Sequence, residues 1–172
     1  MHTNLQKIAE NIKNTDKVLF ILCGLPYSGK TYIAQEIIKS APIVYVSIDN
    51  IFHQHGYDWT SNHVPDKDAW TEIFTEAYEK TRRALNASSN VLYDSTNHTR
   101  ASRDDLRALA ESVHAGAQVI FIEVPLSTVH ARWEETRVNE TRPVINRELL
   151  DSTVKAFEAP TSDEHVSTLL NV

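Results

Sequence analysis

The order of apolar and polar positions predicts strands that alternate with helices along the chain. Short apolar runs predict strands, and the clearest is Val18 to Cys23. Between the runs, apolar residues recur every three or four positions, which is typical of one face of a helix. We expect strands at 17–23, 43–48, 91–94, 117–124 and 166–172, and helices at 3–13, 29–40, 66–86, 102–114, 127–138 and 146–158. Ser102 is the expected N-cap of the helix at 102–114.

This alternation indicates βαβ units, in which helices cover both faces of a mostly parallel sheet. We therefore predict a three-layer α/β/α fold with about five strands. Its 172 residues suit a single domain, and no linker, repeat or low-complexity tract divides residues 1–172. The stretch from His53 to Val64 is long for a connection, so we expect it to be functional or mobile.

A phosphate-binding motif follows the first apolar run. The residues from Gly24 to Thr31 read GLPYSGKT and match G-x-x-x-x-G-K-[ST]. The motif stands between a predicted strand and a predicted helix, which is the context it requires. The sequence thus predicts a P-loop NTPase fold that binds ATP and Mg²⁺. The expected nucleotide-binding residues are Gly24, Tyr27, Ser28, Gly29, Lys30 and Thr31.

Each of these residue types has a chemical reason to stand where it does. The glycines let backbone N–H groups point at phosphate oxygens, and the helix that begins there adds its positive dipole end. Lys30 is expected to bridge the β- and γ-phosphates, and the hydroxyl of Thr31 to hold Mg²⁺. The alternative is a glycine turn followed by a solvated lysine.

Two aspartates follow predicted strands. Asp49 comes after Val44 to Ile48, and Asp94 comes after Val91 to Tyr93. Because parallel strands end at the same edge of a sheet, both carboxylates are expected beside the phosphate-binding loop. Phosphoryl transfer needs one carboxylate to accept the proton of the acceptor hydroxyl and one to reach Mg²⁺. The alternative is that each aspartate caps a turn or helix.

Arginines recur every five residues near the carboxyl end, at Arg132, Arg137, Arg142 and Arg147. Mobile arginines can close over a transferring phosphoryl group, so we predict a helical lid at about 132–146. Some of these arginines are instead expected to pair with glutamates on a solvated helix face.

Composition and charge narrow the choice of function. No glycine has aspartate three residues before it and no asparagine precedes a lysine, so the motifs of a GTPase are missing. The net charge of −6 disfavours non-specific binding to nucleic acid. A single cysteine and the lack of a long apolar segment favour a cytoplasmic location with no membrane partner.

Taken together, these motifs resemble small P-loop kinases related to polynucleotide 5′-hydroxyl kinase. That group includes chloramphenicol phosphotransferase-like and zeta-toxin-like enzymes, which are often labelled AAA-type ATP-binding proteins. The resemblance spans roughly residues 17–170. It rests on Gly24 to Thr31, Ser47 to Asp49, Val91 to Asn97 with Arg100 and Arg103, the arginines Arg132, Arg137 and Arg142, and Phe157 to Pro160 with Glu164.

The resemblance implies a role for several residues. Asp49 matches the general base, and Asp94 matches an aspartate that helps hold the acceptor and the metal. Arg137 best matches the catalytic lid arginine, although Arg132 or Arg142 can take that role. Arg132 and Arg142 are also expected to bind the nucleotide. Asn97 and Arg103 are expected on the acceptor side.

The acceptor itself is left open. Its site is expected in the insert at 50–66, where Tyr57 and Trp59 either stack on a base or sugar or pack as a flap. Phe52 stands where polynucleotide kinase has an arginine, which favours a small molecule or nucleoside over a nucleic-acid 5′-end. We therefore expect a kinase for such an acceptor. The alternatives are a polynucleotide 5′-hydroxyl kinase and a regulatory ATPase without an acceptor.

Overall fold

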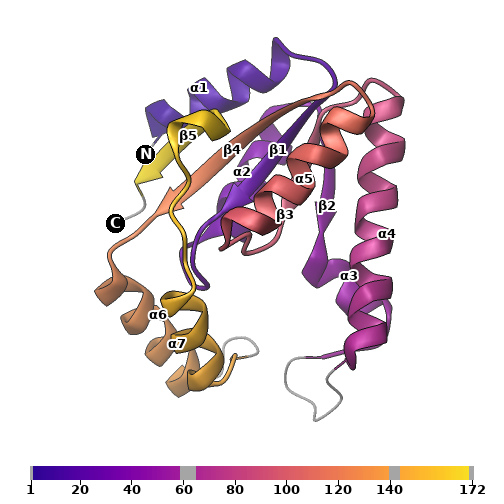
Figure 1. The fold of residues 1–172 in the computed structure, drawn as a ribbon. Coiled ribbons are helices and arrows are strands. Elements are labelled where there is room, and N and C mark those ends of the chain that lie inside the picture. The colour runs from indigo at the N-terminus through magenta and orange to yellow at the C-terminus, as the bar shows by residue number, and fades with distance from the viewer. Residues whose placement is uncertain (1, 59–64, 140–143, 171–172) are drawn as a thin grey trace.

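The sheet of this protein is parallel throughout the described residues, which in the computed structural model are 2–58, 65–139 and 144–170. Its five strands lie in the order β2-β3-β1-β4-β5 (Figure 1). Their bounds are β1 Val18–Cys23, β2 Val44–Ser47, β3 Val91–Asp94, β4 Gly116–Glu123 and β5 Val166–Leu170. The predicted three-layer α/β/α fold is confirmed.

The two faces of the sheet are covered by different helices. The helices α1 (His2–Lys13) and α2 (Lys30–Ser40) pack on one face, against side chains such as Phe20 and Leu22. The helices α3 (Ile48–Gln54), α4 (Lys67–Asn86) and α5 (Arg100–Ser112) pack on the other, against Leu19 and Ile21. Strands buried on both faces need continuous apolar sequence, which is why β1 has no polar residue.

Two more helices form a unit beyond the carboxyl end of the sheet. The helices α6 (Leu126–Asn139) and α7 (Arg147–Lys155) lie side by side in Figure 1. Val129, Trp133 and Leu150 make a small core between them. A short 3₁₀ helix, η1 (Ser162–Glu164), then leads into β5.

Helix caps account for two of the boundaries that differ from the predictions. The strand expected at 43–48 ends at Ser47, whose side chain caps α3 by accepting from the N–H of Asn50 at 3.2 Å. The helix expected at 102–114 begins at Arg100, so the predicted cap at Ser102 is wrong. Thr99 is the N-cap, and its hydroxyl accepts from the N–H of Ser102 at 3.2 Å.

The strand order determines where a ligand can bind. β1 lies between β3 and β4, so the connections after β1 and β3 diverge above the carboxyl end of the sheet. The phosphate-binding motif and both predicted aspartates follow strands at this edge. Among the described residues, no helix is long and apolar enough to cross a membrane.

Candidate active site

The phosphate-binding motif forms a tight loop between β1 and α2. A Cβ on Gly24 would lie 2.8 Å from the carbonyl oxygen of Ile122 and 2.9 Å from the hydroxyl of Ser28, so a side chain does not fit there. Tyr27 and Gly29 have positive φ angles of 64° and 94°. A backbone turned in this way points successive N–H groups inward, which suits the binding of phosphate oxygens.

Two cationic side chains contact the backbone of this loop. The ammonium of Lys30 donates to the carbonyl oxygens of Gly24 and Leu25, each at 2.9 Å. From α6, the guanidinium of Arg132 donates to the carbonyl oxygen of Tyr27 at 3.3 Å. Positive charge from the loop and from the α6 side therefore meets at the place where phosphates are expected.

Asp94 is the last residue of β3 and is buried. The hydroxyl of Tyr45 donates to its carboxylate at 2.6 Å. Burial raises the pKa of Asp94 above its usual range, and the hydrogen bond from Tyr45 and the charge of Lys30 act against this rise. The site thus holds a carboxylate whose charge is costly until a cation approaches it.

Asp49 lies in the first turn of α3 and is exposed. The pairing of Ser47 with Asp94 aligns the ends of β2 and β3, which brings the start of α3 beside Asp94. Asp49 lines the cavity as an exposed carboxylate, so its oxygens can be reached by a hydroxyl that binds there.

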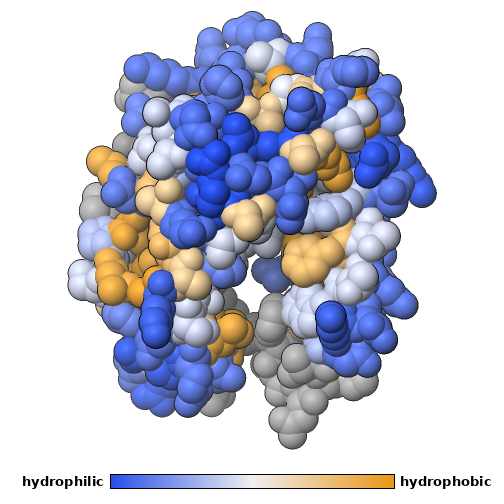
Figure 2. Space-filling model, in the orientation of Figure 1, coloured by the Kyte–Doolittle hydropathy of each residue, from blue (hydrophilic) through white to orange (hydrophobic). Residues whose placement is uncertain are grey.

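One cavity of about 870 Å³ joins these groups. It opens between the side of α3 and α4 and the side of α6 and α7, where Figure 2 shows the molecule hollowed. Of the predicted site residues, those that line it are Tyr27, Gly29, Lys30, Thr31, Asp49, Asp94, Asn97 and Arg132. The structure thus gathers four of the six predicted loop residues and both carboxylates around one space.

The wall of the cavity on the α4 side was not predicted as part of the site. Trp70, Phe74 and Tyr78 line it from α4, and Tyr93 lines it from β3. In the sequence, the aromatic residues of α4 belong to the helical pattern of 66–86, which does not distinguish a core position from a cavity position. The sequence does contain a sign of this wall, because the aromatic residues recur every four positions and so form one row on the helix. The fully buried residues Ile73 and Ala77 form a second row.

The predicted insert contributes less than expected. Tyr57 does not line the cavity, because its ring packs on Phe52 with ring centroids 5.6 Å apart. Phe52 is itself buried and stacks on Trp70. Trp59 lies outside the described residues, so its predicted role stays a prediction.

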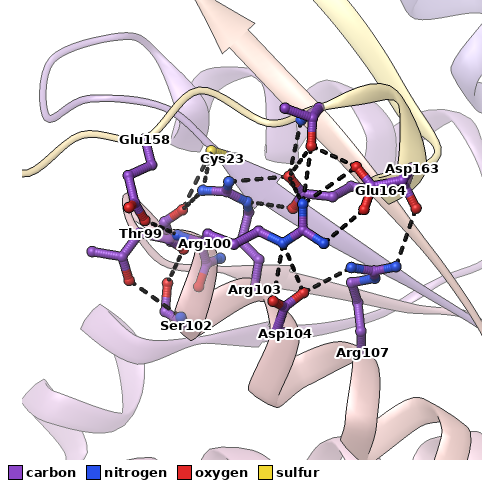
Figure 3. A network of polar contacts seen from close by, with 12 residues as sticks. Cys23, Thr99, Arg100, Ser102, Arg103, Asp104, Arg107, Glu158, Asp163 and Glu164 are labelled. Carbon is purple, nitrogen blue, oxygen red and sulfur yellow. Dashed lines mark hydrogen bonds and ion pairs between the residues drawn. The ribbon is translucent and has the colours of Figure 1, made fainter.

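Arg103 was predicted on the acceptor side, but the structure places it in a buried network beneath the site (Figure 3). Its guanidinium pairs with the carboxylate of Glu164 at 2.6 Å and donates to the carbonyl oxygen of Asn97 at 3.0 Å. The side-chain amide of Asn97 donates to the carbonyl oxygen of Leu22 at 2.7 Å. Arg103 and Asn97 therefore hold the loop after β3 against the end of β1.

The same network extends to the surface through Arg100. Its guanidinium pairs with Asp104 and with Asp163, and its backbone N–H donates to Glu158 (Figure 3). The backbone N–H of Glu158 donates in turn to the carbonyl oxygen of His98 at 2.8 Å. The segment that follows α7 is thus fastened along the start of α5.

The predicted lid arginines do not share one position. Arg132 contacts the phosphate-binding loop and lines the cavity. Arg137 is exposed, pairs with Glu134 at 2.9 Å and does not line the cavity. Arg142 lies outside the described residues. Among the described lid arginines, the geometry favours Arg132 for contact with a nucleotide.

The family of the chain follows from its match to known sequences. The family model described as "Chromatin associated protein KTI12" matches residues 18–167. The chain belongs to the KTI12 family. The protein of Xenopus laevis described as "Protein KTI12 homolog" is 26% identical over 148 residues, which cover 84% of this chain and 51% of that protein. This KTI12-family chain thus spans about half the length of the curated relative it matches.

Solved structures agree with this assignment at the level of fold. Kti12 of Chaetomium thermophilum, in complex with ADP-AlF3, superposes with a TM-score of 0.65 at 20% identity over 88% of each chain. A chain of the Pnkp1/Rnl/Hen1 RNA repair complex gives 0.70 at 20% identity, over 86% of this chain and 46% of that one. A putative kinase of Chloroflexus aurantiacus gives 0.68 at 14% identity, over 89% and 87%. The predicted resemblance to P-loop kinases is confirmed, within the KTI12 family.

Removal of the buried carboxylate of Glu164 tests the network beneath the site. Burial acts to raise the pKa of Glu164, but the hydrogen bonds from Arg103 and from the N–H of Thr161, together with the charges of Arg103 and Arg100, hold the pKa below its usual range. We expect Glu164→Ala to lower the free energy of unfolding by about 3–5 kcal/mol, because it leaves Arg103 buried without its charge partner. The measurement is urea unfolding followed by circular dichroism. Asp163→Ala, at the exposed neighbour, is the matched control, and equal losses in both variants would contradict the assignment.

Replacement of Asp94 tests the cost of its buried charge. At pH 7 we expect Asp94→Asn to raise the melting temperature of this KTI12-family protein by a few degrees. The wild type carries a buried charge above the raised pKa of Asp94, whereas the amide does not. The gain should shrink as the pH falls through the raised pKa of Asp94 toward 3.8, the ordinary pKa of an aspartate, because the folded carboxyl loses its charge before the unfolded one does. Thermal unfolding at pH 7 and pH 4 measures this, and a lower melting temperature of the variant at pH 7 would overturn it.

Proposed function

We propose that this chain transfers the γ-phosphoryl group of ATP to a hydroxyl of a small molecule or nucleoside, with Mg²⁺ as cofactor. The observation that carries the proposal is that Lys30, Asp49 and Asp94 line one cavity at the carboxyl end of the sheet. A nucleotide-binding loop alone needs no carboxylate that faces an acceptor. A kinase needs one within reach of the γ-phosphate.

Each residue at the cavity has a part in this proposal. The loop from Gly24 to Thr31 binds the phosphates through its N–H groups, and Lys30 neutralises charge on the transferring group. A hydroxyl and a carboxylate are hard oxygen ligands that suit Mg²⁺, so Thr31 and Asp94 are the residues that would hold it. The bound ion would draw charge from the phosphate oxygens. Asp49 accepts the proton of the attacking hydroxyl.

A slow ATPase with a regulatory role is the second candidate. It is favoured by the KTI12 family match and by the Kti12 neighbour, which is described in complex with ADP-AlF3. In such a protein water attacks the γ-phosphate and the region around Asp49 takes no acceptor. A 5′-hydroxyl end of a polynucleotide is a weaker candidate, because Phe52 is buried and leaves no arginine at that position.

Exchange of Asp49 for asparagine separates the two leading candidates. With γ-labelled ATP and a panel of nucleosides, sugars, aminoglycosides, chloramphenicol and a 5′-hydroxyl oligonucleotide, we expect a labelled product from the wild type. Asp49→Asn should lower the rate of transfer by about 100-fold or more and leave ATP affinity unchanged, because the variant loses the proton acceptor alone. Lys30→Ala should lose both.

Asp163→Asn makes the same chemical change at an exposed aspartate far from the loop and serves as the control. If no acceptor is labelled and Asp49→Asn leaves the release of phosphate unchanged, transfer is refuted for that panel. The regulatory ATPase is then the function that remains.

The two described lid arginines should differ in their effect on the reaction. We expect Arg132→Ala to lower kcat by about 100-fold, because it removes a cation that contacts the phosphate-binding loop. Arg137→Ala should change kcat by no more than about twofold, since an exposed ion pair with Glu134 contributes little. Steady-state kinetics of ADP formation measures both. A larger loss in Arg137→Ala would show that the lid rearranges when nucleotide binds.

A further inference from the structure

Tyr93 lines the cavity, and its hydroxyl is a buried donor. The residue is 1% exposed, and its hydroxyl has no hydrogen-bond partner among the described residues. Burial raises the pKa of Tyr93 far above its usual range, so the phenol keeps its proton. Buried polar groups are nearly always satisfied, which makes an unsatisfied one at a cavity a sign of a missing ligand atom.

Beside this hydroxyl stands a row of aromatic rings. Trp70, Phe74 and Tyr78 recur at four-residue intervals on α4 and line the same cavity. Trp70 is backed by Phe52, with ring centroids 5.5 Å apart, and Tyr78 lies 6.3 Å from Tyr93 by the same measure. Phe74 is 38% exposed, so its ring has surface left to contact a ligand. The wall is thus aromatic along its length, and at Trp70 it is supported from behind.

The charges around this wall exclude an anionic ligand. Among the described residues that line the cavity, Lys30 and Arg132 carry a permanent positive charge, and both contact the phosphate-binding loop; the histidines His53 and His98 line the cavity as well. The carboxylates that line it are Asp49, in the first turn of the helix that packs on α4, and Asp94, which follows Tyr93. A phosphate placed against this wall would meet like charge without a cation to offset it.

From this juxtaposition we propose that the wall of Trp70, Phe74, Tyr78 and Tyr93 binds the base of an uncharged nucleoside, whose sugar hydroxyl is the phosphoryl acceptor. This identification of the acceptor rests on the kinase function proposed above. A base offers a flat ring to the aromatic side chains, and its ring nitrogen or carbonyl oxygen accepts from the Tyr93 hydroxyl. An ammonium group cannot accept that proton, and a hexose has no flat ring.

The reaction at this site balances without any further reactant. The oxygen of a ribose hydroxyl attacks the γ-phosphorus of ATP and forms a new P–O bond. The bond between the γ-phosphorus and the bridging oxygen of ADP breaks, and its electron pair stays on ADP. The proton of the hydroxyl passes to Asp49. The products are a nucleoside monophosphate and ADP.

Binding is the direct test, because it does not depend on turnover. The whole chain is first saturated with Mg²⁺ and a non-hydrolysable ATP analogue, so that added nucleosides cannot enter the ATP site. Adenosine, guanosine, cytidine and uridine are then titrated by isothermal calorimetry. Ribose, glucose, kanamycin and adenosine 5′-monophosphate are the comparison ligands. We expect at least one nucleoside to bind at least about tenfold more tightly than each of these four.

Two substitutions test the residues that carry the inference. Tyr93→Phe removes only the hydroxyl, so it should weaken nucleoside binding by about tenfold while the melting temperature stays the same or rises. Phe74→Leu keeps an apolar side chain at a partly exposed position and should also weaken binding. Tyr57→Phe is the matched control, because it also removes only a phenolic hydroxyl and Tyr57 does not line the cavity. It should leave nucleoside affinity unchanged.

The outcomes distinguish this inference from the proposed function. The base-binding wall is refuted if the ATP analogue binds but no nucleoside does, or if kanamycin, glucose or the monophosphate binds more tightly than the nucleosides. The proposed phosphoryl transfer to another acceptor is not refuted by either result. An unchanged nucleoside affinity in Tyr93→Phe would refute the role of the hydroxyl. If nucleosides bind as expected but no label moves from ATP, the wall is supported and the kinase function fails.

Discussion

The buried ion pair between the guanidinium of Arg103 and the carboxylate of Glu164 fixes the relative positions of three parts of this protein. Arg103 comes from α5, Glu164 precedes β5, and the same guanidinium reaches the carbonyl oxygen of Asn97 in the loop after β3. Two buried charges are tolerated only when their hydrogen bonds are nearly complete, so the arrangement allows little movement. The loop that it holds lines the cavity beside Asp94. One wall of the site is thus made rigid by an ion pair that does not itself line the cavity.

The parts of the site that could be predicted from sequence are those set by local chain geometry. The motif from Gly24 to Thr31 forms its loop from consecutive residues, so its presence is visible without knowledge of the fold. Asp49 and Asp94 follow strands, and parallel strands end at one edge, so their proximity needs only the alternation of strands and helices. Ser47 and Thr99 cap helices, so the observed boundaries there differ slightly from the predicted ones. Both carboxylates nevertheless lie at the predicted edge of the sheet.

The parts that escaped prediction depend on contacts between distant segments or on rotation around a helix. Glu164 and Arg103 lie far apart in the sequence, and the residues around each of them do not indicate that the two side chains will pair. Residues five apart on a helix are turned by about 140° from one another, so a regular spacing from Arg132 to Arg137 places them on different sides. The aromatic residues of α4 follow the same helical period as its core residues, so periodicity alone cannot assign them to the cavity.

The small core of α6 and α7 does not end at those helices. Leu25 and Tyr27 of the phosphate-binding loop pack against its buried residues Val129, Trp133 and Leu150. The unit of α6 and α7 and the phosphate-binding loop therefore share one packed surface, so a movement of either must be accommodated by the other. Coupling between two sites is reciprocal, so a macromolecule that bound α6 and α7 more tightly in the presence of nucleotide would raise nucleotide affinity by the same factor.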